Sequence, residues 1–198
     1  MTVEPNTERR ASILQAAVGV FLRYGYKKTS MEDVARAAGL SRQGLYLHFA
    51  AKDVLFKDAV TLLTQQSRVA TRAALALDHL PIEERLLGAF VALKSHSDGS
   101  ELSPEHMAEL LATAAQLAGP AIAQLDQAVL ADLQRALLSS GVAARWKGAG
   151  LTARDLAQHL TSASHGIKHF TRTAAEYRER MRVAVCLVCG PASKQKRK

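Results

Sequence analysis

Apolar residues recur at intervals of three and four along most of the chain, which is the spacing of one helix face. In the first such segment Ile13, Ala17, Phe21 and Tyr24 share a face, and Gly25 marks its end. No segment shows a convincing strand pattern. The sequence therefore predicts an all-α fold of about nine helices. We expect them at residues 8–25, 30–38, 41–49, 52–77, 82–95, 104–118, 120–139, 152–170 and 174–189, with an irregular stretch at 142–150.

Two short helices follow the first one, with a tight turn between them. Ser30 is a good N-cap, and Asp33 three residues later completes an approximate capping box. Gly39 then ends the second helix, because glycine accepts the left-handed conformation that follows a helix. Ser41 caps the next helix. Three short helices with a glycine-containing turn before the third form the helix-turn-helix pattern.

The third of these helices has one apolar face and one polar face. Leu45 and Phe49 lie four residues apart and are expected to face a small core. The opposite face would enter the major groove of DNA, where Arg pairs best with guanine and Gln with adenine. Arg42 and Gln43 are therefore the predicted base readers, and the exposed side of Leu47 suits a thymine methyl group.

At these residues the chain resembles the DNA-binding domain of TetR-family transcriptional regulators. The similar segment is ILQAAVGVFLRYGYKKTSMEDVARAAGLSRQGLYLHFAAKDVLF, residues 13–56. One departure is Ala51, where the family often has a capping residue before the lysine. The resemblance implies phosphate or backbone contacts for one group of residues and base contacts for another. The first group is Thr29, Ser30, Tyr46, His48 and Lys52, and the second is Arg42, Gln43, Gly44 and Leu47.

The resemblance also implies how the whole chain is organised. Residues 1–51 would form the helix-turn-helix DNA-binding domain, and residues 52–189 a helical domain for effector binding and dimerisation. A homodimer would bind a palindromic, double-stranded DNA operator, because a two-fold protein matches a two-fold site. We expect a repressor that a small-molecule effector releases from DNA.

The expected effector site lies in the second domain, because apolar and aromatic side chains usually line small-molecule pockets. The candidate lining residues are Phe90, Met107, Leu111, Leu125 and Trp146. The expected dimer interface lies on the last two helices. The helix at 152–170 carries an apolar stripe and, beside it, a second stripe of small and polar residues, which suggests one internal face and one partner face. The expected interface residues are His159, Ser162, Gly166, His169, Met181 and Val188.

Two residue groups leave an alternative open. His165 and His169 are four residues apart on one helix, with His159 nearby, and Cys186 and Cys189 form a C-x-x-C motif. A metal- or redox-sensing regulator would use these groups. A further alternative is a helical protein that binds a small molecule but no DNA.

Composition, charge and the absence of certain motifs limit which classes of protein this chain could belong to. The 198 residues carry a net charge of +8, of which the tail at 190–198 supplies four, and we expect that tail to be disordered. The polar start and the lack of 18 consecutive apolar residues argue against a signal peptide and a membrane span, so a cytoplasmic protein without membrane contact is expected. No phosphate loop, H-E-x-x-H motif or nucleophile elbow is present, so neither an enzyme nor a cofactor is expected.

Overall fold

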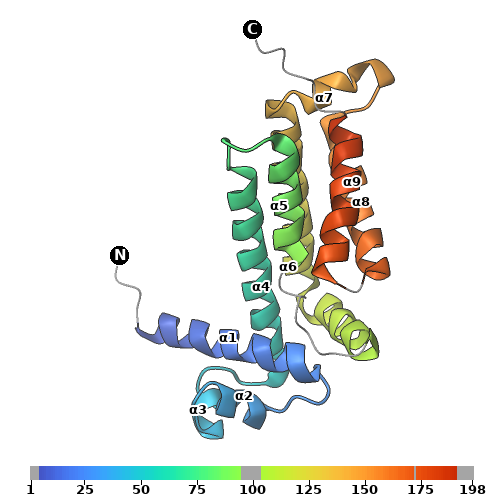
Figure 1. Ribbon diagram of the computed structural model, residues 1–198. Coiled ribbons are helices and arrows are strands. Elements are labelled where there is room, and N and C mark those ends of the chain that lie inside the picture. The colour runs from blue at the N-terminus through green and yellow to red at the C-terminus, as the bar shows by residue number, and fades with distance from the viewer. Residues whose placement is uncertain (1–4, 95–103, 172, 191–198) are drawn as a thin grey trace. The chain divides into compact units, whose positions relative to one another are not determined.

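The computed structural model describes residues 5–94, 104–171 and 173–190, and within these ranges every regular element is helical (Figure 1). The all-α prediction is therefore confirmed. The elements are α1 (Pro5–Tyr24), α2 (Met31–Ala37), α3 (Arg42–Tyr46), α4 (Lys52–Leu75), α5 (Ile82–Lys94), α6 (Pro104–Ser139), α7 (Val142–Arg145), the 3-10 helix η2 (Lys147–Ala149), α8 (Ala153–Phe170) and α9 (Ala174–Cys189). The predicted loop at 96–103 and the tail after residue 190 lie outside the described residues.

Three elements differ in detail from the prediction. α3 covers only five residues, and Leu47 and His48 lie in a turn instead of a further helical turn. The expected break near Gly119 is a kink inside α6, where Ala118 has non-helical angles of φ −128° and ψ 19° just before Pro120. The stretch at 142–150 is not irregular throughout, because it contains α7 and η2.

The described residues of Met1–Gln66 and Gly99–Gln124 form one compact unit, called unit 1. Its core joins apolar faces of α1, α2, α3, the first half of α4 and the first half of α6. The buried rings of Phe21 and Phe56 meet edge to face, and the partly buried Tyr26 ring meets Phe56 in the same way, with ring centroids 4.9 Å apart in both pairs. The other core residues include Ile13, Ala17, Met31, Val34, Leu45, Phe49, Leu55, Leu110 and Ala114.

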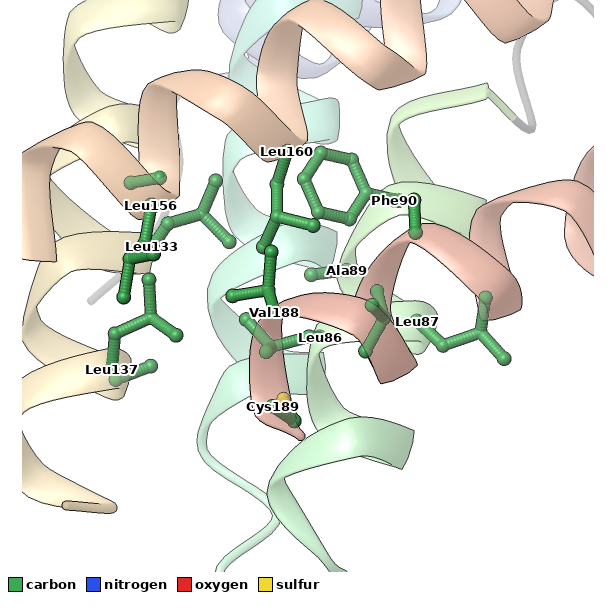
Figure 2. Close-up of a cluster of buried hydrophobic side chains, with 14 of the residues drawn as sticks. Leu86, Leu87, Ala89, Phe90, Leu133, Leu137, Leu156, Leu160, Val188 and Cys189 are labelled. Atoms are coloured by element: carbon green, nitrogen blue, oxygen red, sulfur yellow. The ribbon is translucent and has the colours of Figure 1, made fainter. Parts of the chain in front are cut away.

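The described residues of Ser67–Asp98 and Leu125–Lys198 form unit 2. α9 packs against both α5 and α8. Figure 2 shows part of the resulting core, in which Phe90 from α5, Leu160 from α8 and Val188 from α9 face one another. Within the described part of the chain, no helix is both long enough and apolar enough to cross a bilayer.

α4 and α6 each contribute residues to both units, since the units divide after Gln66 and after Gln124. These boundaries describe packing, whereas the expected boundary at residue 51 separates two functions. The functional boundary stays a prediction.

Candidate nucleic-acid interface

The turn before α3 is built by capping interactions at both ends of α2. At its start, the Ser30 hydroxyl accepts a hydrogen bond from the Asp33 amide, and the Asp33 carboxylate accepts one from the Ser30 amide. The hydrogen bond from the Ser30 side chain holds the pKa of Asp33 below its usual range. At its end, Gly39 takes φ +64°, and the Leu40 amide donates to the Ala35 carbonyl at 2.8 Å. This is a Schellman arrangement, which confirms the predicted role of Gly39.

α3 is fixed by a cap at its start and by two buried side chains. The Ser41 hydroxyl accepts a hydrogen bond from the Gly44 amide at 3.0 Å. Leu45 and Phe49 are buried in the core of unit 1, as their spacing predicts. A Cβ at position 44 would lie 3.2 Å from the Ser41 Oγ, closer than most such contacts. Gly44 therefore leaves room for the cap.

The opposite face of α3 is open and carries the predicted base readers. Arg42 and Gln43 are exposed. Tyr46 is 42% exposed, and the Arg42 guanidinium carbon lies 5.8 Å from the centre of its ring. Leu47 is 84% exposed, which leaves its methyl groups available to a partner. This short helix and the turn after it thus present a cation, an amide, a phenol and an apolar group together.

Lys52 and Thr29 make internal contacts that the sequence did not predict. The Lys52 ammonium donates hydrogen bonds to the carbonyls of Tyr26 and Thr29, both at 3.1 Å, and lies 4.2 Å from the centre of the Tyr26 ring. The Thr29 side chain is 2% exposed and donates to the Gly25 carbonyl at 2.7 Å. The expected phosphate contact of the Thr29 hydroxyl is therefore wrong, because that hydroxyl is buried in the turn between α1 and α2. Ser30, next to it, is exposed.

A second contact closes the same turn. The Tyr26 hydroxyl donates a hydrogen bond to the carboxylate of Asp53, in the first turn of α4. Burial, together with this hydrogen bond and the nearby negative charge, raises the pKa of Tyr26 to about 12. Lys52 and Asp53, which are neighbours in sequence, both hold the segment that leads into α2.

Arg10 is a residue that the sequence analysis missed. Its guanidinium donates to the His48 carbonyl at 2.7 Å and pairs with the Asp58 carboxylate at 2.5 Å. The guanidinium carbon also lies 4.2 Å from the centre of the Phe49 ring. Periodicity places Arg10 on the polar side of α1, and no local motif indicates which residues it reaches. His48 itself is half-buried, and its carbonyl is held by this contact.

Two residues of the expected dimer interface lie elsewhere. Met181 and Val188 are 0% and 4% exposed and belong to the core of unit 2, so they pack against their own chain. They are apolar and seven residues apart, and this spacing fits the face of α9 that packs inward as well as it fits a face that meets a partner. The α8 residues of the expected interface are placed differently. His159, Ser162 and His169 are exposed and Gly166 is half-buried.

The expected effector-pocket residues fall in two units. Phe90 is buried in the core of unit 2, and Leu125 and Trp146 pack against that core. The Trp146 indole N–H donates to the Val188 carbonyl at 2.7 Å, so it satisfies a carbonyl in the last turn of α9. Met107 and Leu111 belong to unit 1, where Leu111 is exposed. The pocket stays a prediction.

The residues considered for metal or redox sensing are not gathered into a site. Across residues 5–94, 104–171 and 173–190 there is no group of three or more His, Cys, Asp or Glu side chains arranged to hold a metal ion. Cys186 is exposed, whereas Cys189 is buried (Figure 2). Burial raises the pKa of the Cys189 thiol to about 12, which disfavours the reactive thiolate.

Comparison with known proteins agrees with this geometry. Residues 13–59 match the family model for "Bacterial regulatory proteins, tetR family". The chain is 42% identical over 57 residues to the uncharacterized HTH-type transcriptional regulator YfiR of Bacillus subtilis, covering 29% of this chain and 28% of that protein. It is 42% identical over 52 residues to the HTH-type transcriptional activator FasR of Mycolicibacterium smegmatis, covering 26% of this chain and 24% of that protein. The chain thus spans about a quarter of the length of these relatives.

The fold is shared over a much longer stretch. A crystal structure from Mesorhizobium loti, described as a TetR-family transcriptional regulator, superposes with a TM-score of 0.70. The superposition covers 94% of this chain and 97% of that chain at 24% identity, so it shows the fold alone. Residues 13–59, which contain α2, α3 and the turn between them, are thus similar to the TetR family of bacterial regulatory proteins, and over most of its length the chain shares the fold of the Mesorhizobium loti structure.

Proposed function

We propose that this protein is a DNA-binding transcriptional regulator, and specifically a repressor that leaves its operator when it binds a small molecule. The observation that carries the proposal is the open surface of α3 and the turn after it, where Arg42, Gln43, Tyr46 and Leu47 are all exposed, while buried Leu45 anchors the helix. Exposed polar and apolar groups on so small an element suit the edges of base pairs in the major groove.

Each residue has a proposed role. Arg42 and Gln43 read bases, and Leu47 contacts a thymine methyl group, while Gly44 lets the helix backbone come close to DNA. Ser30, Tyr46 and His48 contact the phosphate backbone, and these contacts set the position of the protein on the duplex. All the residues that we propose to contact DNA are Ser30, Arg42, Gln43, Gly44, Tyr46, Leu47, His48 and Lys52. Lys52 has three N–H groups and uses two internally, so one is left for a phosphate.

We propose a homodimer that meets a palindromic operator, with α8 forming the centre of the contact. Support comes from the outward face of α8, where His159, Ser162, Gly166 and His169 are not covered by the core of unit 2. On α9 the proposed contacts are the exposed residues Val183 and Leu187, four positions apart, in place of Met181 and Val188.

The proposed division of labour assigns residues 1–51 to DNA and residues 52–189 to effector binding and dimerisation. Phe90, Leu125 and Trp146 remain the best effector candidates, since they lie in or against one apolar core. For a nearly complete switch, the effector must prefer the released state by about 10⁴-fold. The protein would act in the cytoplasm and without enzymatic activity.

The test is selection of bound duplexes from a random DNA pool, first with the natural protein and then with Arg42→Ala and Gln43→Ala. We expect a palindromic consensus whose stringency falls at particular base pairs, by about 1–3 kcal/mol for each reader. The same consensus with the same stringency in both variants would exclude them as readers. Selection of no sequence at all would exclude the function itself. A reporter gene behind the selected operator then separates repression from activation.

The metal- or redox-sensing alternative is less well supported. No metal-holding group is found among the described residues, and Cys189 is buried with a raised pKa. Metal analysis of the purified protein, and operator binding under reducing and oxidising conditions, would decide it.

A further inference from the structure

The end of the reading helix has little structure of its own. α3 contains five residues, which is too short to be stable in isolation. The four residues after it, from Leu47 to Ala50, form a turn that leads to α4. The angle of α3 therefore depends on contacts made by its two ends. Ser41 and the Schellman turn hold the first end.

Arg10 contacts the residues just after the other end and also reaches α4. Its guanidinium donates to the His48 carbonyl, lies over the Phe49 ring and pairs with Asp58, the seventh residue of α4. These partners lie 38 to 48 residues away in sequence. One planar group thus joins α1, the corner after α3, and α4. A guanidinium suits this task because its N–H groups form a rigid fork and its face stacks on an aromatic ring.

We propose that Arg10 is a positioning residue for DNA recognition, which sets the angle of α3 by clamping its C-terminal corner to α1 and α4. The inference rests on the proposed function of α3, and it deepens that function by adding a residue that does not touch a base. Arg10 acts through His48, Phe49 and Asp58. It needs no DNA contact of its own.

Replacing Asp58 tests the proposal, because the two possible roles of Arg10 predict opposite changes in operator affinity. A carboxylate near DNA repels phosphate, so its removal should strengthen binding if Arg10 were simply a phosphate contact that Asp58 restrains. If the pair instead holds α3, then Asp58→Asn loosens the clamp and weakens binding. The two roles of Arg10 therefore predict opposite changes in operator affinity for the same variant.

The experiment measures operator affinity of the full chain by fluorescence anisotropy at several salt concentrations, using the duplex selected by the natural protein. Four variants are compared: Arg10→Ala, Arg10→Lys, Asp58→Asn and the control Val18→Ala. Val18 is buried in α1 and contacts the same core, so its truncation lowers stability without touching the clamp. Circular dichroism establishes that every variant is folded at the assay temperature.

We expect Arg10→Ala to weaken binding about tenfold, or ~1.4 kcal/mol, with the salt slope unchanged. Asp58→Asn should weaken binding several-fold, and Arg10→Lys should fall between, because an ammonium cannot serve both partners and stack. Val18→Ala should bind normally. Normal DNA binding by Arg10→Ala would overturn the proposal. So would tighter binding by Asp58→Asn together with a salt slope that Arg10→Ala lowers by about 0.9. A loss of affinity in Val18→Ala as large as that in Arg10→Ala would overturn it as well.

Hydrogen exchange without DNA separates this inference from the proposed function. The Phe49 amide donates to the Leu45 carbonyl at 3.0 Å, and its exchange reports on the corner. We expect faster exchange at Phe49 in Arg10→Ala, and unchanged exchange there refutes the clamp. If the natural protein binds no DNA, the proposed function fails, and the exchange result still decides whether Arg10 holds α3.

Discussion

Gly166 offers a direct test of the proposed dimer. It lies inside α8, and a Cβ built on it would meet nothing within 4 Å apart from its chain neighbours and the backbone of its own helix. Within one protomer, Gly166→Leu should therefore cause no clash. It should even stabilise α8 by about 0.5–1 kcal/mol, because glycine is a poor helix former. A partner chain packed on this face would have to accommodate the new side chain.

The two effects of Gly166→Leu differ in sign and size. The gain within the protomer corresponds to a rise in melting temperature of roughly 1–4 °C for a chain of this length. Overfilling a packed contact typically costs about 1–3 kcal/mol. A two-fold interface contains the residue twice, so the dimer should lose roughly 2–6 kcal/mol. Every 1.4 kcal/mol is tenfold, so its dissociation constant should rise at least about thirtyfold.

Sedimentation velocity over a range of protein concentrations measures the association, and calorimetry at a concentration where the chain is monomeric measures the protomer. Gly19→Leu is the matched control, because Gly19 also lies inside a helix, and a Cβ built on it would likewise meet nothing within 4 Å beyond its chain neighbours and its own helix backbone. We expect the control to associate normally. Normal association of Gly166→Leu would refute the placement of α8 at the interface. A protomer destabilised by Gly166→Leu would refute the reasoning about open space.

Three further changes test individual contacts. The buried Thr71 hydroxyl (1% exposed) has no hydrogen-bond partner in the described chain, so Thr71→Val should stabilise the protein by about 1 kcal/mol in urea denaturation. Thr29→Val removes a hydrogen bond to Gly25 and should destabilise the protein by about as much. If Thr29→Val is the more stable of the two variants, both assignments are contradicted. Tyr26 has a pKa raised to about 12, so its contribution to protein stability is complete below pH 10 and is lost as the pH rises through 12. Tyr26→Phe should therefore remove part of the fall in melting temperature over this pH range. If the melting temperature of the variant falls with pH as it does in the natural protein, the contact is excluded. Lys52→Ala should weaken binding to all DNA sequences alike, as measured by titration against several duplexes, and a loss at one base position would mean that the residue reads bases.

The local features of the fold could be predicted because their causes are local. Ser30 with Asp33 forms the capping box that their spacing predicts, and the structure has a second one with the same spacing at Thr152 and Asp155. Gly39 takes the left-handed conformation that ends α2. Each of these depends on residues within five positions of one another. The same holds for Leu45 and Phe49, whose spacing predicts a shared inner face.

The contacts that hold the candidate site together could not be predicted, because they join distant residues. Lys52 reaches the carbonyls of Tyr26 and Thr29, and Arg10 reaches His48. Long basic side chains can extend several ångströms in any direction from a helix, and their acceptors are backbone atoms that leave no trace in the sequence. A charged residue beside a DNA-binding helix therefore looks the same whether it binds phosphate or holds the protein's own backbone.

The error on α9 has a related cause. An apolar stripe shows that a helix face is buried, but the periodicity is the same whether the face meets its own chain or a second copy. Met181 and Val188 belong to the first kind, since they lie in the core of unit 2. What distinguishes the second kind is an apolar residue left over after the core is full, and Val183 and Leu187 fit that description. On α8 the polar stripe around Gly166 is left over in the same sense. A proposed interface should accordingly be read from the residues that the protomer's own packing leaves exposed.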